Sequence, residues 1–205
     1  MLQDFVQQLI NTINNRINGI HTAFPGTISE FDPGSCTATV SPSIKFRKPN
    51  GETLNYPNLS GIPVVFPCSS EATVAYPIKS GDGCLVVVSE ESTDYWKYGQ
   101  ETYSDLKFDL TNAICIPGLF NSGNEAIEEA VSENAVVVKV KDTKMRIKDE
   151  EILADVKGTE LKVKEQEITV DVKGTKFNVK NNEVTIDATD VKIKGNVKID
   201  GTLTY

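Results

Sequence analysis

The sequence predicts a mainly β protein in which an amphipathic helix leads into a small β-barrel and then into a shaft of intertwined strands. Three observations predict this. An apolar stripe at helical spacing opens the chain, short strand patterns separated by Gly and Pro turns fill the middle, and a tandem repeat follows. We place the segments at residues 1–20 for the helix, 21–116 for the barrel, 117–133 for a linker and 134–205 for the shaft.

Residues 2–20 carry the pattern of an amphipathic helix. Apolar residues recur three or four positions apart, polar residues fill the other face, and Gly19 is placed to end the helix. We expect the apolar stripe, which Ile10 widens, to be a docking face formed by Leu2, Phe5, Val6, Leu9, Ile13, Ile17 and Ile20. The stripe leaves its partner open: symmetry mates or another protein on one side, the chain's own downstream domain on the other.

The middle of the chain predicts a compact β domain. Its expected strands alternate with turns such as Asp32-Pro33-Gly34-Ser35 and Pro49-Asn50-Gly51. Short strands of this number are typical of a small Greek-key barrel such as an OB-fold. OB-folds often bind oligonucleotides, but a net charge of −8 and the scarcity of Arg and aromatic pairs argue against nucleic acid as a partner. The expected strands cover residues 25–31, 36–40, 62–66, 84–88 and 106–116.

Residues 140–187 contain three tandem copies of a 16-residue unit. The second and third copies agree at 9 of 16 positions, which is too many for coincidence at a fixed period. Each copy holds two short strands with one apolar and one charged face, separated by polar segments that contain turn formers such as Gly158 and Gly174. The linker before them has room for one or two helical turns at residues 125–133.

These one-sided strands lack a cover for their apolar face within one chain. A ribbon of this kind exposes long edges and aggregates when left alone. Three identical ribbons wound together, apolar faces inward, solve the problem in a narrow prism that accepts Val, Ile and Leu. A single-chain β-solenoid and a flat antiparallel sheet are the alternatives, and we favour the intertwined trimeric β-helix or β-prism over both.

The apolar positions of the repeats and of the residues after them define the expected trimer core. This core consists of Val140, Met145, Ile147, Ile152, Val156, Leu161, Val163, Ile168, Val170, Phe177, Val179, Val184, Ile186, Val191, Ile193, Val197 and Ile199. We expect the tip of the shaft to be formed by Gly201, Thr202, Leu203, Thr204 and Tyr205.

No residue pattern predicts an enzyme or a metal site. His21 is the only imidazole, which we expect to be a solvated residue at the helix end, so no Ser/His/Asp or Cys/His set can be built away from it. Glu90, Glu91 and Asp94 fit a polar loop better than an acid pair. The four cysteines form no Cys-x-x-Cys pair, and we expect Cys36, Cys68, Cys84 and Cys115 to be small buried thiols in a reducing cytosol.

Two further predictions concern an aromatic cluster and the targeting segments. Trp96, with Tyr95 and Tyr98, is either an interface patch or barrel core, and we favour core. Asp4 stands where a secretory signal would carry a basic residue, and no apolar run approaches 18 residues, so we expect neither a signal peptide nor a transmembrane helix.

The order of helix, small barrel and β-repeat shaft resembles the central spike proteins of contractile injection systems, the contractile phage tails and R-type bacteriocins. The resemblance covers essentially the whole chain. Within the barrel it rests on short motifs at residues 25–28, 62–67, 77–83, 94–96 and 112–119.

The resemblance implies a homotrimeric baseplate spike, assembled in the bacterial cytoplasm, that pierces the target envelope. The helix and barrel would bind the tail hub, and the shaft would point at the target cell. Many such spikes bind apical iron through a C-terminal His-x-His pair, but His21 lies far from that end, so we expect no cofactor. Either the tip closes with its own side chains or a separate tip protein caps it. The alternative function is a trimeric receptor-binding tail fibre or adhesin, which a distal aromatic-rich head would distinguish.

Overall fold

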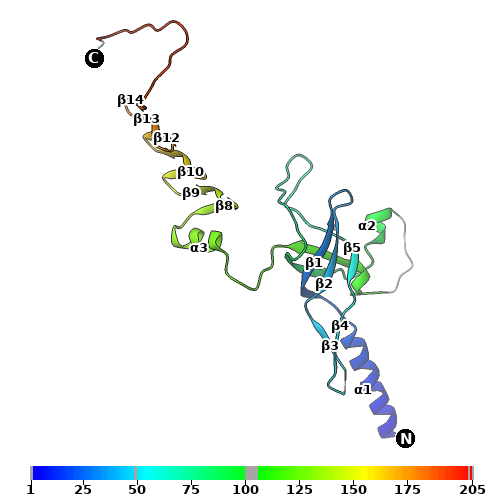
Figure 1. Ribbon diagram of the computed structural model, residues 1–205. Helices are drawn as coiled ribbons and strands as arrows, with labels where there is room; N and C mark the ends of the chain where they lie inside the picture. Colours follow the sequence, from blue (N-terminus) through cyan, green and yellow to red (C-terminus); the bar gives the residue numbers. More distant parts are fainter. Residues whose placement is uncertain (1, 49, 100–105, 203, 205) are drawn as a thin grey trace. The chain divides into compact units, whose positions relative to one another are not determined.

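The computed structural model describes residues 2–48, 50–99, 106–202 and 204. The chain divides into two compact units, residues 1–121 and residues 122–205. The first unit contains helix α1 (Leu2–Asn18), a curled β-sheet and helix α2 (Asp94–Tyr98). The second contains helix α3 (Glu125–Ser132) and a long antiparallel sheet (Figure 1). The expected mainly β class with an N-terminal helix is confirmed.

The sheet of the first unit has five strands in the order β5-β2-β1-β6-β7. Each pair of neighbours is antiparallel, and the two edge strands also meet. Val64, just after β5, forms a parallel bridge with Cys115 of β7, and the Val65 N–H donates to the Cys115 carbonyl at 2.9 Å. The sheet therefore curls until its edges touch. Its strands are β1 (Ala23–Asp32), β2 (Thr37–Pro42), β5 (Leu59–Pro63), β6 (Gly83–Val88) and β7 (Ala113–Pro117).

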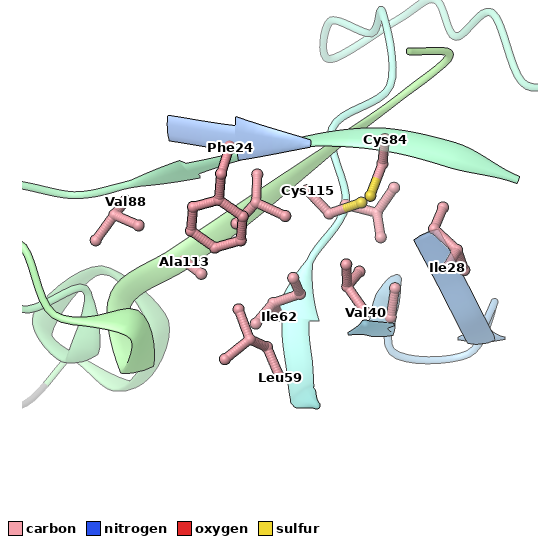
Figure 2. Packing of buried hydrophobic residues seen from close by; sticks show 12 residues of the cluster. Phe24, Ile28, Val40, Leu59, Ile62, Cys84, Val88, Ala113 and Cys115 are labelled. Carbon is pink, nitrogen blue, oxygen red and sulfur yellow. The ribbon is translucent and has the colours of Figure 1, made fainter. Parts of the chain in front are cut away.

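The core of this unit fills the inside of the curled sheet (Figure 2). Alternate residues of β1, β2 and β6 point inward, which gives the period-2 burial expected of strands with one wet face. The residues with no exposed surface are Ile28, Val40, Cys84, Val86, Ala113 and Cys115. Full burial of an Ile or Val side chain contributes about 1.5–3 kcal/mol, so Ile28, Val40 and Val86 make this cluster the main stabilising element of the unit.

Two features of this unit differ from the sequence-based expectations. A two-stranded hairpin, β3 (Lys45–Arg47) and β4 (Thr53–Asn55), surrounds the expected turn at residues 49–51. The strand expected at 106–116 is shorter, because a 3₁₀ turn, η1 (Leu110–Asn112), precedes β7. Asp109 starts that turn: its carboxylate accepts from the Thr111 N–H at 2.9 Å and the Thr111 hydroxyl at 2.7 Å, and these bonds lower the pKa of Asp109.

The sheet of the second unit is a meander of seven antiparallel strands in sequence order. The turns at the start of the second and third repeats each contain two residues with positive φ, Lys157 (54°) with Gly158 (83°) and Lys173 (49°) with Gly174 (106°). This geometry matches the twist of the flanking strands. The strands are β8 (Val136–Val140), β9 (Thr143–Ile147), β10 (Glu151–Val156), β11 (Thr159–Lys164), β12 (Glu167–Val172), β13 (Thr175–Lys180) and β14 (Glu183–Asp187).

The single chain thus forms an antiparallel sheet, the arrangement that we ranked below the intertwined β-prism. After Asp187 the described residues contain no strand, although we expected strands around Val191–Ile193 and Val197–Ile199. Each of those segments is only three residues long, and Gly195 separates them. Three residues are at the lower limit of strand length, so these segments gain little from pairing within one chain.

Candidate functional site

The most distinctive surface of the molecule is the apolar face of the seven-stranded sheet. Antiparallel partners share a face, and the register places apolar residues opposite each other on every pair of strands. Ile152 pairs with Val163, Leu161 with Val170, and Phe177 with Ile186. The face therefore runs without interruption from β8 to β14.

This apolar face is open in the single chain. Most of its large side chains, including Leu161 and Ile168 at 44% each, remain exposed. Among the expected core residues only Val163, Val170 and Val179 are half-buried, and the others are exposed. Exposed apolar surface of this extent marks an interaction site. Val191, Ile193, Val197 and Ile199 are also exposed, but they lie beyond the last strand.

The opposite face of the sheet is charged and internally paired. Asn178 donates to the Glu167 carboxylate at 2.7 Å, and Lys180 lies 3.5 Å from the same group. Lys176 lies 3.5 Å from Asp171. The Asn178 amide holds the pKa of Glu167 below its usual value, and the Gly174 N–H does the same for Asp171. These pairings are made within the chain, and the charged side chains of this face suit contact with water.

Helix α3 is tied to the charged face at β9 by a network of carboxylates and cations. Lys144 donates to Glu129 at 2.7 Å, and the Arg146 guanidinium lies 3.5 Å from Glu129 and 3.1 Å from Glu151. Lys148 pairs with Glu133. The hydrogen bonds from Lys144 and Lys148 lower the pKa of Glu129 and Glu133. The network leaves the apolar face free, because every contact is made on the other side of the sheet.

Sequence reasoning missed this network and one core residue inside it. Leu153 is 6% exposed although it lies on the charged face, opposite Arg146 and Lys162. The methylene stems of such side chains cover apolar surface while their charges stay wet. The available signal was the run Ile152-Leu153-Ala154, which breaks the alternation of the repeat.

Helix α1 carries a second open apolar surface. It spans Leu2–Asn18 and contains no buried residue, and the Gly19 N–H ends it by donating to the carbonyls of Asn15 and Arg16. Every residue of the expected docking face is exposed, including Ile20, which lies just past the helix end. No described residue of the chain buries this stripe.

The remaining predicted positions are placed as follows. Of the expected tip, Gly201, Thr202 and Thr204 are exposed, whereas Leu203 and Tyr205 lie outside the described residues. His21 is half-buried rather than fully solvated, since its ring meets Tyr56 edge-on at 5.6 Å. Glu90 and Glu91 are exposed as expected for a polar loop, and Glu91 pairs with Lys107.

The preference for Trp96 as barrel core is wrong. Tyr95, Trp96 and Tyr98 are 65–71% exposed, because a five-residue helix cannot turn three such closely spaced aromatics inward. Trp96 and Tyr98 line a groove of about 650 Å³ together with Cys36 and Val64.

The expectation of four buried thiols holds for two cysteines only. Cys36 and Cys68 are exposed in loops, whereas Cys84 and Cys115 are buried in the core. The sulfurs of the latter two lie next to each other (Figure 2). Hydrogen bonding between the two thiols lowers the pKa of Cys84 and raises that of Cys115. Both are free thiols.

Within the described ranges, no group of three or more His, Cys, Asp or Glu side chains is arranged to hold a metal ion. None of the helices that the structure describes combines the length and apolar character needed to cross a membrane. The absence of an enzyme activity and of a cofactor stays a prediction.

The curled sheet has a recognisable relative. Residues 24–118 match the family described as the phage protein Gp138 N-terminal domain. The matched range begins in β1 and ends just after β7, so this Gp138-like domain coincides with the curled sheet. The match links this part of the chain to a phage protein, and residues 119–205 lie outside it.

Two further comparisons add less. A solved structure described as "Structure of PdpA-VgrG Complex, Lidless" is similar at 13% identity and a TM-score of 0.31, covering 69% of this chain and 86% of that one. No curated protein sequence matches the chain.

Proposed function

We propose that the protein is the central spike of a contractile injection system, which binds the tail hub and mechanically pierces the target envelope. The observation that carries this proposal is the uncovered apolar face across β8 to β14. Three copies with these faces turned inward would form a closed prism with the charged faces in water. The Gp138-like domain supports placing that prism in a phage-type particle.

In this proposal the two units have separate tasks. The curled sheet is an OB-type barrel that, together with α1, attaches to the hub. Its strand order and the bridge between its edges support the OB assignment. The second unit is the shaft, and its tip is formed by Gly201, Thr202, Leu203, Thr204 and Tyr205. The protein acts without catalysis and without a cofactor, at the baseplate of a phage or bacteriocin tail.

The shaft suits axial load. In the prism the five inner strands of each sheet are hydrogen-bonded on both sides, and only β8 and β14 are edge strands. Seven strands spaced by about 4.8 Å give a length of about 30 Å, comparable to the hydrocarbon core of a bilayer. The charged outer face disfavours stable insertion, so contraction of the particle must drive the shaft through.

Deletion of residues 134–205 tests this function. Particles assembled with the shortened chain are expected to attach to target cells but to lose killing or infection. The curled sheet should remain folded, because its core contains no residue from the deleted segment. As a matched control, Thr169→Asp on the charged face should leave killing unchanged. Full activity of the deletion variant would contradict the piercing role.

A further inference from the structure

The apolar residues of helix α1 follow a heptad spacing as well as lying on one face. Val6, Ile10, Ile13, Ile17 and Ile20 follow one another at spacings of 4, 3, 4 and 3. This is the heptad spacing of a coiled-coil seam, in which Ile10 and Ile17 occupy the a positions and Val6 and Ile13 the d positions, and Ile20 continues the spacing just past the helix end. All five side chains are between 44% and 58% exposed, so the whole seam is unpartnered in the single chain.

The residue types on the seam indicate how many helices meet. Isoleucine at both a and d positions shifts parallel coiled coils away from dimers toward trimers and tetramers. Leu2 and Leu9 occupy g positions beside the seam, where a third helix buries more surface than a second one does. The flanking e positions hold Gln7 and Asn14, which introduce no like-charge pair between helices.

We propose that α1 forms a parallel three-stranded coiled coil with α1 of two further copies of this chain. The inference rests on the proposed trimer: a threefold axis makes the three copies of α1 parallel and in register, as the seam requires. Asp4 near the N-terminus and Arg16 near the C-terminus complement each helix dipole. The coiled coil provides a second interface between the three chains, in the first unit, whereas the shaft belongs to the second unit.

Helix α1 is too short to hold three chains together without the shaft. Seventeen residues provide about two and a half heptads, and isolated helices near this length are marginal in water. The coiled coil therefore forms once the shaft has brought the three chains together. Phe5, at a c position, stays on the outside of the bundle, so the bundle keeps an apolar contact for another protein.

Cysteine cross-linking in the full chain tests the proposal. The exposed thiols are first removed with Cys36→Ser and Cys68→Ser, and Ile17→Cys is then compared with Asn18→Cys, its outward-facing neighbour. A bis-maleimide too short to join residues on the outer faces should link Ile17→Cys chains into pairs, at least tenfold more than Asn18→Cys chains. Ile10→Cys against Asn11→Cys repeats the comparison one heptad earlier, in case one substitution disturbs the helix.

Light scattering on the same samples distinguishes failure of the coiled coil from failure of the proposed trimer. Trimeric mass with selective linking of Ile17→Cys and Ile10→Cys is the expected result. Trimeric mass with equal linking of seam and outward positions overturns the coiled coil while leaving the shaft intact. Monomeric mass overturns both the coiled coil and the proposed spike.

Discussion

Val170→Asp is expected to abolish the trimer. Val170 lies at the centre of the sheet, paired with Leu161 on one side and Phe177 on the other. In the closed prism it faces the axis, where three carboxylates would meet without cations or water. The effective penalty for burying each charge is on the order of several kcal/mol, and the charges also repel one another. Light scattering should report a chain of 22.4 kDa.

The neighbouring residue supplies the control. Thr169 lies on the charged face, paired with Lys162 and Asn178, so Thr169→Asp adds a carboxylate beside a cation and in water. That variant should stay trimeric. Equal masses for the two variants would contradict the prism. If the sheet worked as a monomer, both faces would be open, and neither substitution would carry a large cost.

Gly83→Ala is expected to destabilise the curled sheet by about 3 kcal/mol, at the upper end of overpacking effects. A Cβ on Gly83 would lie 1.9 Å from the Leu119 carbonyl oxygen, a backbone atom that cannot rotate away. The two segments are also joined by the Gly118 N–H, which donates to the Gly83 carbonyl at 3.0 Å. Relieving the clash breaks this bond and displaces the chain that leaves β7.

Thermal unfolding followed by circular dichroism measures this effect. Gly19→Ala is the matched control, because a Cβ there meets only atoms at 3.5 Å or more. We expect a clear drop in the transition of the curled sheet for Gly83→Ala, little change for Gly19→Ala, and trimeric mass for both. An unchanged transition for Gly83→Ala would show that the described approach of β6 to Leu119 is wrong.

The strands of the second unit could be predicted closely, because alternation and turn chemistry agree there. The Lys-Gly pairs fix the hairpin ends, and a one-residue slip would turn Leu161 and Val163 to the charged side. Positions where a local signal interrupts the alternation of apolar and polar residues were harder to predict. Asp109 starts a 3₁₀ turn inside an apolar segment, and Leu153 is buried by charged neighbours rather than by apolar ones.

What covers an apolar surface is not encoded locally. The spacing of α1 and of the repeats predicts which side chains share a face, and the structure places them so. The partner that covers such a surface comes from the assembly rather than from the chain itself. Leu161 and Ile17 are therefore both exposed in the single chain. The aromatic residues of α2 are equally hard to place from the sequence. Trp96 is of a type often found in cores, yet it is exposed at the surface.

The solution mass of the intact chain decides whether three copies assemble through the apolar face of the seven-stranded sheet. Light scattering, followed by gel electrophoresis of unheated samples in SDS, should give 67.2 kDa, three times the 22.4 kDa chain, and the trimer should persist in SDS. A mass of 22.4 kDa would mean that the seven-stranded sheet is stable with its apolar face open, and it would contradict the spike.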